Sequence, residues 1–239
     1  MPATPSFQTT RWTMVRKAVT SDDAGAPAAL ANFCAGYWFP IYAFIRRSGA
    51  NSHDAEDLTQ SFFARLLEKD ILSAADPGKG KLRTFLLTCV RHFLADARDR
   101  IQTQKRGLGL VSSLDAAQAE ERYAAEPADE LSPDRIFQRR WALGLLGETH
   151  RLLGEEWAAD GKGELFTALR PFLGFDAASK KSYDEVAVEL GVSAETLRSH
   201  VFRLRKRWRD LLLAQVAATL DDPTPENVRA ELSELLGVV

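Results

Sequence analysis

Apolar residues recur at three-and-four spacing along most of the chain, which is the period of helices that bury one face. A first such stretch covers residues 28–47, a second begins near Ser52, and a third covers residues 81–100. Runs of alternating residues bounded by hairpin turns, the pattern typical of strands, are nearly absent. The pattern therefore predicts an all-α fold class.

These three stretches predict a compact helical domain at the start of the chain. Pro40 lies inside the first stretch and is expected to kink or split that helix. Ser52 is expected to cap the second helix. Residues 76–80 contain Asp, Pro and two Gly, so they predict a loop before the third helix. The buried face of the second helix is expected to carry Ala55, Leu58, Phe62 and Leu66.

The segment between Gly107 and Ser132 is acidic and alanine-rich, which is typical of a mobile connector. Ser132 and Pro133 then supply an N-cap and a first-turn proline, so a second helical region begins there. Its core is expected to hold Trp141, Leu145, Leu152 and Trp157. The predicted organisation is two small helical domains joined by a flexible acidic linker: an N-terminal extension 1–27, a first domain 28–106, the linker 107–134, a second domain 135–214 and a C-terminal helical extension 215–239.

The charges are unevenly distributed along the chain. A formal net charge of −2 argues against a nucleic-acid-binding protein. However, residues 1–107 hold 15 Lys and Arg against 10 Asp and Glu, and residues 180–214 hold 8 against 5. Residues 108–134 hold 1 against 7, and residues 215–239 hold 1 against 5. Two basic blocks are thus separated and followed by acidic segments, so binding to nucleic acid remains open.

Residues 182–208, SYDEVAVELGVSAETLRSHVFRLRKRW, carry the most specific pattern in the chain. Ser182 and Glu185 are spaced as a capping box, and Gly191 suits a left-handed turn. Ser193 then caps a second helix, so the segment predicts a helix-turn-helix whose second helix enters the DNA major groove. The candidate DNA-binding residues on its exposed side are Arg198, Ser199, Phe202, Arg203, Arg205 and Arg207. The alternative is a solvated charged face on an amphipathic helix.

Residues 53–69, HDAEDLTQSFFARLLEK, resemble the acidic helix of extracytoplasmic-function (ECF) RNA polymerase sigma factors. The resemblance implies that this helix binds the β′ clamp helices of core RNA polymerase. It assigns that role to Asp54, Glu56, Asp57 and Gln60. Carboxylates in a first turn also complement the helix dipole, which is the competing interpretation.

Residues 81–100, KLRTFLLTCVRHFLADARDR, resemble the segment with which the same family melts and captures the minus-ten promoter element. The residues implicated are Lys81, Arg83, Phe85, Arg91, His92 and Arg98. Many family members have tryptophan at the position of Phe85 and asparagine at that of His92, so promoter preference cannot be transferred. A core helix with a charged outer face is the alternative.

Other classes of function find little support in the sequence. The first ten residues lack a signal-peptide pattern and no apolar run is long enough to span a bilayer, so we expect a cytoplasmic protein without membrane contact. Cys34 and Cys89 lie in apolar stretches and are expected to be buried free thiols rather than a disulfide or switch. No zinc, phosphate-loop or catalytic motif is present, so we predict no metal, no cofactor and no enzymatic activity.

The tail is expected to form a last helix after Thr224 that packs on the second domain, with a regulatory, autoinhibitory contact as the competing hypothesis. The predicted function is that of a sigma factor directing RNA polymerase to specific promoters. Its expected partners are core RNA polymerase (β′ clamp helices and β) and promoter DNA, with an anti-sigma factor or other regulator left open. The alternatives are a helix-turn-helix regulator that does not join polymerase and a helical protein-interaction module.

Overall fold

The computed structural model describes residues 26–68, 71–72, 81–103, 116–124, 131–174 and 181–238. Within these ranges the regular elements are all helices and no strand is present, so the predicted all-α class is confirmed. None of these helices is long and apolar enough to cross a membrane. The chain divides into two compact units: the first consists of the described parts of Met1–Leu145 and Val216–Val239, and the second is Leu146–Gln215.

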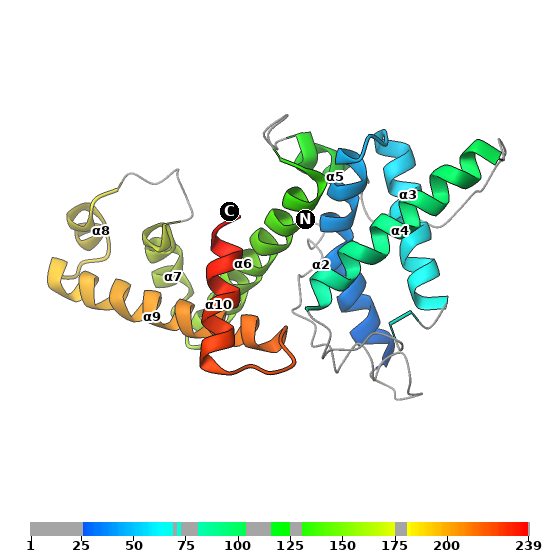
Figure 1. The fold of residues 1–239 in the computed structure, drawn as a ribbon. Coiled ribbons are helices and arrows are strands. Elements are labelled where there is room, and N and C mark those ends of the chain that lie inside the picture. Colours follow the sequence, from blue (N-terminus) through cyan, green and yellow to red (C-terminus); the bar gives the residue numbers. More distant parts are fainter. Residues whose placement is uncertain are drawn as a thin grey trace. The chain divides into compact units, whose positions relative to one another are not determined.

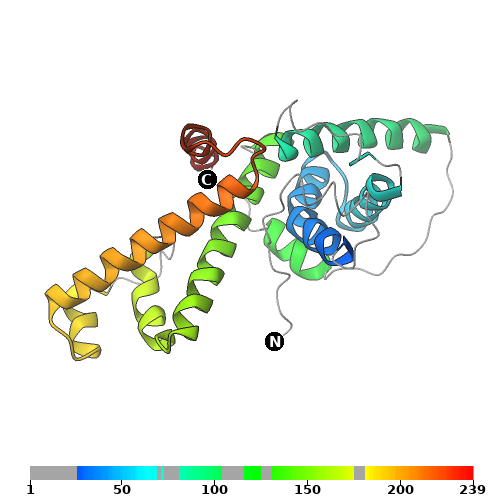
Figure 2. The same ribbon diagram turned by 90° about the horizontal axis from the view of Figure 1, so that it is seen from below.

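The centre of the first unit is formed by α2 (Ala26–Arg47), α3 (Ser52–Glu68), α4 (Leu82–Thr103) and α5 (Ala116–Ala124). Helices α2 and α3 pack side by side (Figure 1). In Figure 2, α4 runs along one side of this pair and α5 lies on the other. The start of α6 (Pro133–Ala159) and helix α10 (Pro225–Leu236) complete the unit.

Helix α2 runs without interruption through Pro40, so the predicted split is wrong. The side chains around the proline are buried deeply: Phe33, Ile41 and Tyr42 are fully inaccessible to solvent. A proline inside a helix costs about 3 kcal/mol. Burying one large apolar side chain contributes roughly 1.5–3 kcal/mol. Several such side chains therefore outweigh the lost backbone hydrogen bond, and the helix continues.

The first half of α6 belongs to the first unit, although the sequence places residues 135–214 in the second domain. Trp141 is almost fully buried, and its ring stacks on that of Tyr37 with 6.4 Å between centroids. Leu145 is buried in the same unit. Their expected place in the core of the second domain is thus wrong, because helical spacing shows that a side chain is buried but not which partner buries it.

The second unit consists of the second half of α6, α7 (Gly163–Leu169), the 3-10 helix η2 (Arg170–Leu173), α8 (Tyr183–Glu189) and most of α9 (Ala194–Ala218). Its core is one apolar cluster drawn from four helices: Leu153, Leu169, Val186, Ala187, Leu197, Val201 and Leu204. Trp157 and Trp208 pack against this cluster. The cluster holds α8 against the N-terminal part of α9, which leaves the other side of α9 exposed.

The predicted linker contains helix α5, which the acidic composition did not indicate. Glu120 of α5 receives hydrogen bonds from Arg46 at 2.5 and 2.9 Å and from the Tyr42 hydroxyl at 2.6 Å. The Arg122 guanidinium lies 4.1 Å from the centre of the Phe39 ring. These contacts attach α5 to α2. The other parts of the linker that precede residue 131 lie outside the described residues.

Candidate nucleic-acid and protein interfaces

The acidic residues of α3 line the exposed side of that helix. Ala55, Thr59 and Phe62 are buried on its opposite side, and Phe63 is buried as well. Asp54 and Asp57 are exposed, whereas Glu56 and Gln60 are half-buried. The four residues predicted to bind polymerase therefore lie on one helix and reach solvent together. Among the expected buried positions, Leu58 is only half-buried, because Thr59 and Phe63 share the interior side with Phe62.

Asn51, not Ser52, caps α3. The Asn51 side-chain oxygen accepts a hydrogen bond from the backbone N–H of Asp54 at 2.8 Å, and its amide donates to the Asp54 carboxylate at 2.8 Å. The predicted cap is thus wrong by one residue, because Asn is as good a cap as Ser and has an acidic partner three positions later. Asp54 consequently stabilises the helix start, whereas the side-chain contact of Asp57 within the described residues is a distant one with His53, at 3.8 Å.

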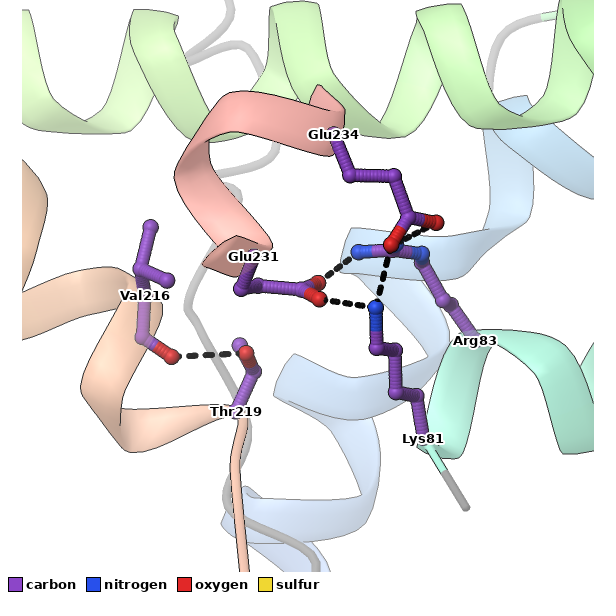
Figure 3. A network of polar contacts seen from close by, with 6 residues as sticks. All are labelled: Lys81, Arg83, Val216, Thr219, Glu231 and Glu234. Carbon is purple, nitrogen blue, oxygen red and sulfur yellow. Dashed lines mark hydrogen bonds and ion pairs between the residues drawn. The ribbon is translucent and has the colours of Figure 1, made fainter. Parts of the chain in front are cut away.

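The cations at the start of α4 are engaged within the protein (Figure 3). Arg83 is 4% exposed, and its guanidinium forms ion pairs with Glu231 and, at 2.6 Å, with Glu234. Lys81 forms ion pairs with Glu231 at 2.5 Å and with Glu234. Burial alone would raise the pKa of Glu234, but hydrogen bonds from Lys81 and Arg83 and their positive charges lower it overall. Both glutamates belong to α10.

Helix α10 therefore packs in the first unit. The expectation that the tail packs on the second domain is wrong. The apolar spacing of this tail predicts a buried stripe of Val228, Leu232, Leu235 and Leu236. Val228 and Leu235 are buried, whereas Leu232 is half-buried and Leu236 is 50% exposed. The physical reason for the difference is charge: Glu231 is only 2% exposed and requires a buried cation, which Arg83 supplies. The sequence contained one signal for this pairing, the acidic tail, but nothing that identified its basic partner.

The remaining candidate residues of α4 differ in their surroundings. Arg91 donates to the Asp134 carboxylate at 2.5 and 3.1 Å, with both side chains well exposed. His92 is exposed and Phe85 is half-buried. Arg98 is in the helix, but its side chain lies outside the described residues. Three of the six predicted minus-ten residues, Lys81, Arg83 and Arg91, thus have carboxylate partners within the first unit.

The turn between α8 and α9 is built as the sequence predicts. Glu185 accepts from the backbone N–H of Ser182 at 2.6 Å and donates its own backbone N–H to the Ser182 hydroxyl, which completes the capping box. Hydrogen bonds from the Ser182 backbone N–H and from the Ser182 hydroxyl to the carboxylate lower the pKa of Glu185. Gly191 has φ +65°, which a side chain would strain, and Ser193 accepts from the backbone N–H of Thr196 at 3.1 Å.

The candidate DNA-binding residues of α9 form two groups. Arg205 donates to the Phe172 carbonyl at 2.7 and 3.0 Å, and Arg207 donates to Glu156 at 2.5 and 2.8 Å, so both are tied to the second unit. The other group is exposed toward the N-terminal end of α9: Arg198, Ser199, Phe202 and Arg203. Phe202 is 70% exposed. This group, which we call the α9 face, is not ion-paired within the described part of the chain.

Cys34 and Cys89 are free, as the sequence predicts, and both are half-buried. Burial raises the pKa of each thiol to about 11. With this raised pKa, both thiols are protonated near neutral pH. Since the thiolate is the reactive form, they are then poorly reactive.

Comparison with known proteins finds similarity to sigma factors. The family described as sigma-70 region 2 matches residues 40–106, a range that includes α3 and α4. The ECF RNA polymerase sigma factor SigE of Mycolicibacterium smegmatis is 27% identical over 180 residues, which cover 75% of this chain. The match spans 60% of that relative's length, and no solved structure matches. The two matches agree with the motifs in α3 and α4: residues 40–106 are similar to sigma-70 region 2, and the chain, over 75% of its length, is similar to an ECF RNA polymerase sigma factor.

Proposed function

We propose that this protein directs RNA polymerase to specific promoters and initiates transcription there. The observation that carries the proposal is the match of residues 40–106 to sigma-70 region 2, because that range contains both the acidic helix α3 and the basic helix α4. The protein acts by binding and carries out no chemistry of its own. Its partners are core polymerase and promoter DNA, so its place of action is the cytoplasm.

Helix α3 is the proposed polymerase contact. Its carboxylates at Asp54 and Asp57 are exposed, and Glu56 and Gln60 lie beside them. Charged groups of one sign on a rigid helix attract a basic surface and select its orientation. Core burial on the opposite side fixes the helix, so these side chains are held in place before the partner arrives.

The α9 face is the proposed reader of the minus-thirty-five element. Arginines such as Arg198 and Arg203 can pair bidentately with guanine, and Phe202 can contact a thymine methyl group. Phe202 is 70% exposed, so its ring is available for such a contact. Arg205 and Arg207 are already bonded to Phe172 and Glu156, so their proposed contribution is to position α9 and to attract phosphates.

Helix α4 is the proposed contact for the minus-ten element. Single-stranded bases are held by a positive track combined with side chains that stack. Arg91, His92 and Phe85 lie within about two turns of one another on this helix, with Lys81 and Arg83 at its start.

The decisive experiment is co-purification of the full chain with core polymerase, followed by run-off transcription on genomic fragments. We expect a stable complex and discrete transcripts that core polymerase alone does not produce. If the folded chain binds DNA in a salt-dependent manner but does not join polymerase, it is a helix-turn-helix regulator. If it binds neither, it is a protein-interaction module.

A further inference from the structure

Helix α10 places two carboxylates directly on cations that the proposed function requires for DNA. Glu231 and Glu234 contact Lys81 and Arg83 across about 150 residues of sequence (Figure 3). Of the four side chains, Arg83 and Glu231 are almost completely buried, at 4% and 2% exposed. The Arg83 guanidinium therefore has no path to a phosphate while α10 occupies this position.

Carboxylates and phosphates use the same donors of an arginine or lysine side chain. Both accept two parallel hydrogen bonds from a guanidinium, so one excludes the other at the same cation. Glu234 bonds to both Lys81 and Arg83, and Glu231 does the same. The negative charge of α10 therefore takes the position of nucleic acid at the start of α4.

A third acidic residue, Asp134, forms a similar ion pair further along α4. Arg91 is bonded to Asp134, which lies in the first turn of α6. This pair is well exposed, with side chains 50% and 38% accessible, so solvent screens it and it opens easily. The buried contacts of α10 are consequently the stronger of the two obstacles to DNA.

The attachment of α10 suits a segment that can leave. It is a 12-residue helix that follows an exposed turn at residues 221–224. Its apolar contribution is small, since Val228 and Leu235 are its buried apolar residues. Thr224 caps it by accepting from the backbone N–H of Asn227 at 3.2 Å, so its start is specified locally. Local capping and a small buried area allow the helix to detach as a body.

We propose that α10 is an internal competitor for DNA: it covers Lys81 and Arg83 in the free protein, and a promoter strand must displace it in order to bind these two cations. This proposal rests on the proposed function and adds a regulatory step to it. The displacing event is binding of a polyanion, here the single strand itself.

The test compares full-length variants by fluorescence anisotropy on a labelled single-stranded DNA of about 20 nucleotides. Glu231→Gln combined with Glu234→Gln removes both carboxylate charges while keeping side-chain size. We expect this variant to bind about tenfold more tightly than the wild type, because two cations become available to phosphates.

The matched control is Asp221→Asn combined with Glu226→Gln, which removes the same charge from exposed positions of the tail. The control should bind within about twofold of the wild type, since uniform charge changes act only through screened long-range attraction. Equal gains in the two double variants would overturn the proposal, because the effect would then reflect net charge alone.

Two further variants keep the result decisive. If circular dichroism shows that the variant with both Glu231→Gln and Glu234→Gln has lost its fold, Glu234→Gln alone replaces it. Glu234 is 49% exposed, so its substitution disturbs the core less. Adding Lys81→Gln to the glutamate variant removes one of the released cations, so the affinity for single-stranded DNA should return to the wild-type value. A variant that binds DNA no better than wild type, while the chain still joins polymerase, refutes the competitor role only. Loss of both DNA and polymerase binding in the wild type refutes the proposed function itself.

Discussion

The basic residues of α4 and of α9 have similar sequence patterns but different surroundings. At the start of α4, Arg83 is buried against two glutamates, whereas Arg203 on the α9 face is exposed and has only weak contacts of 3.4 Å or more within its own helix. A buried ion pair supports the fold, and an exposed arginine remains available to a ligand. The number of Lys and Arg residues in a helix therefore does not measure its capacity to bind nucleic acid.

The largest effect expected from this comparison is on stability. Arg83→Gln leaves Glu231 buried with Lys81 as its remaining cation. We expect a loss of about 3 kcal/mol, the lower end for a broken buried pair, because Lys81 compensates in part. Arg203→Gln should change stability by less than about 0.5 kcal/mol. Urea unfolding followed by circular dichroism measures the free energy of unfolding of both variants. Equal losses would show that Arg83 is no more important for stability than Arg203.

The next effect is on DNA recognition by the α9 face. Arg203→Ala should weaken binding to a selected upstream element by about 1–3 kcal/mol if the side chain contacts a base edge. Lys206→Ala, at an exposed position of the same helix, is the control and should weaken binding to all sequences by a similar small amount. Competition between the element and random DNA separates the two. An equal loss on both DNAs for Arg203→Ala assigns it to a phosphate instead.

Acidic residues likewise differ between exposed side chains and side chains that are hydrogen-bonded within the protein. Asp57→Lys reverses a charge on the exposed side of α3 and should reduce polymerase affinity about tenfold, or about 1.4 kcal/mol. Glu68→Lys, about 16 Å further along the same helix, is the matched control. Surface plasmon resonance with immobilised core polymerase gives both values. Undiminished binding of the Asp57 variant would exclude α3 as the contact.

The smallest effect concerns Glu120, an acidic residue that is already engaged. Hydrogen bonds from Arg46 lower its pKa, so its contribution to folding is complete above the ordinary carboxyl value of 4.5 and is lost as the pH falls through the lowered pKa. Backbone amides of residues 116–124 should therefore exchange hydrogen faster at pH values below 4.5 than above it, after correction for intrinsic rates. Glu120→Gln should remove this pH dependence; its persistence would assign the change to another group.

Local signals in the sequence predicted local structure well. The capping box at Ser182, the left-handed Gly191 and the cap at Ser193 each involve residues within four positions, so the pattern contains the whole interaction. The acidic side of α3 was predictable for the same reason, since helical spacing alone places Asp57 on the side of the helix away from the buried Phe62, with Asp54 one turn before it.

Pairings between distant residues were not predictable. Glu120 meets Arg46 across 74 residues, and the alanine-rich segment around it resembles a connector as much as a helix. Trp141 shows the apolar spacing of a core residue, but that spacing does not reveal that its partner is Tyr37. The contact of α10 with α4 likewise depends on two charges that only the folded chain brings together.

The two half-buried thiols provide a built-in reporter of breathing motions in one part of the molecule. The chain has only two cysteines, on α2 and α4, and both helices belong to the first unit. Because both cysteines are half-buried and burial raises the pKa of their thiols to about 11, alkylation at neutral pH is slow and accelerates when these helices expose the sulfur further. The labelling rate of the unmodified protein therefore measures transient opening of the first unit, without contribution from the second.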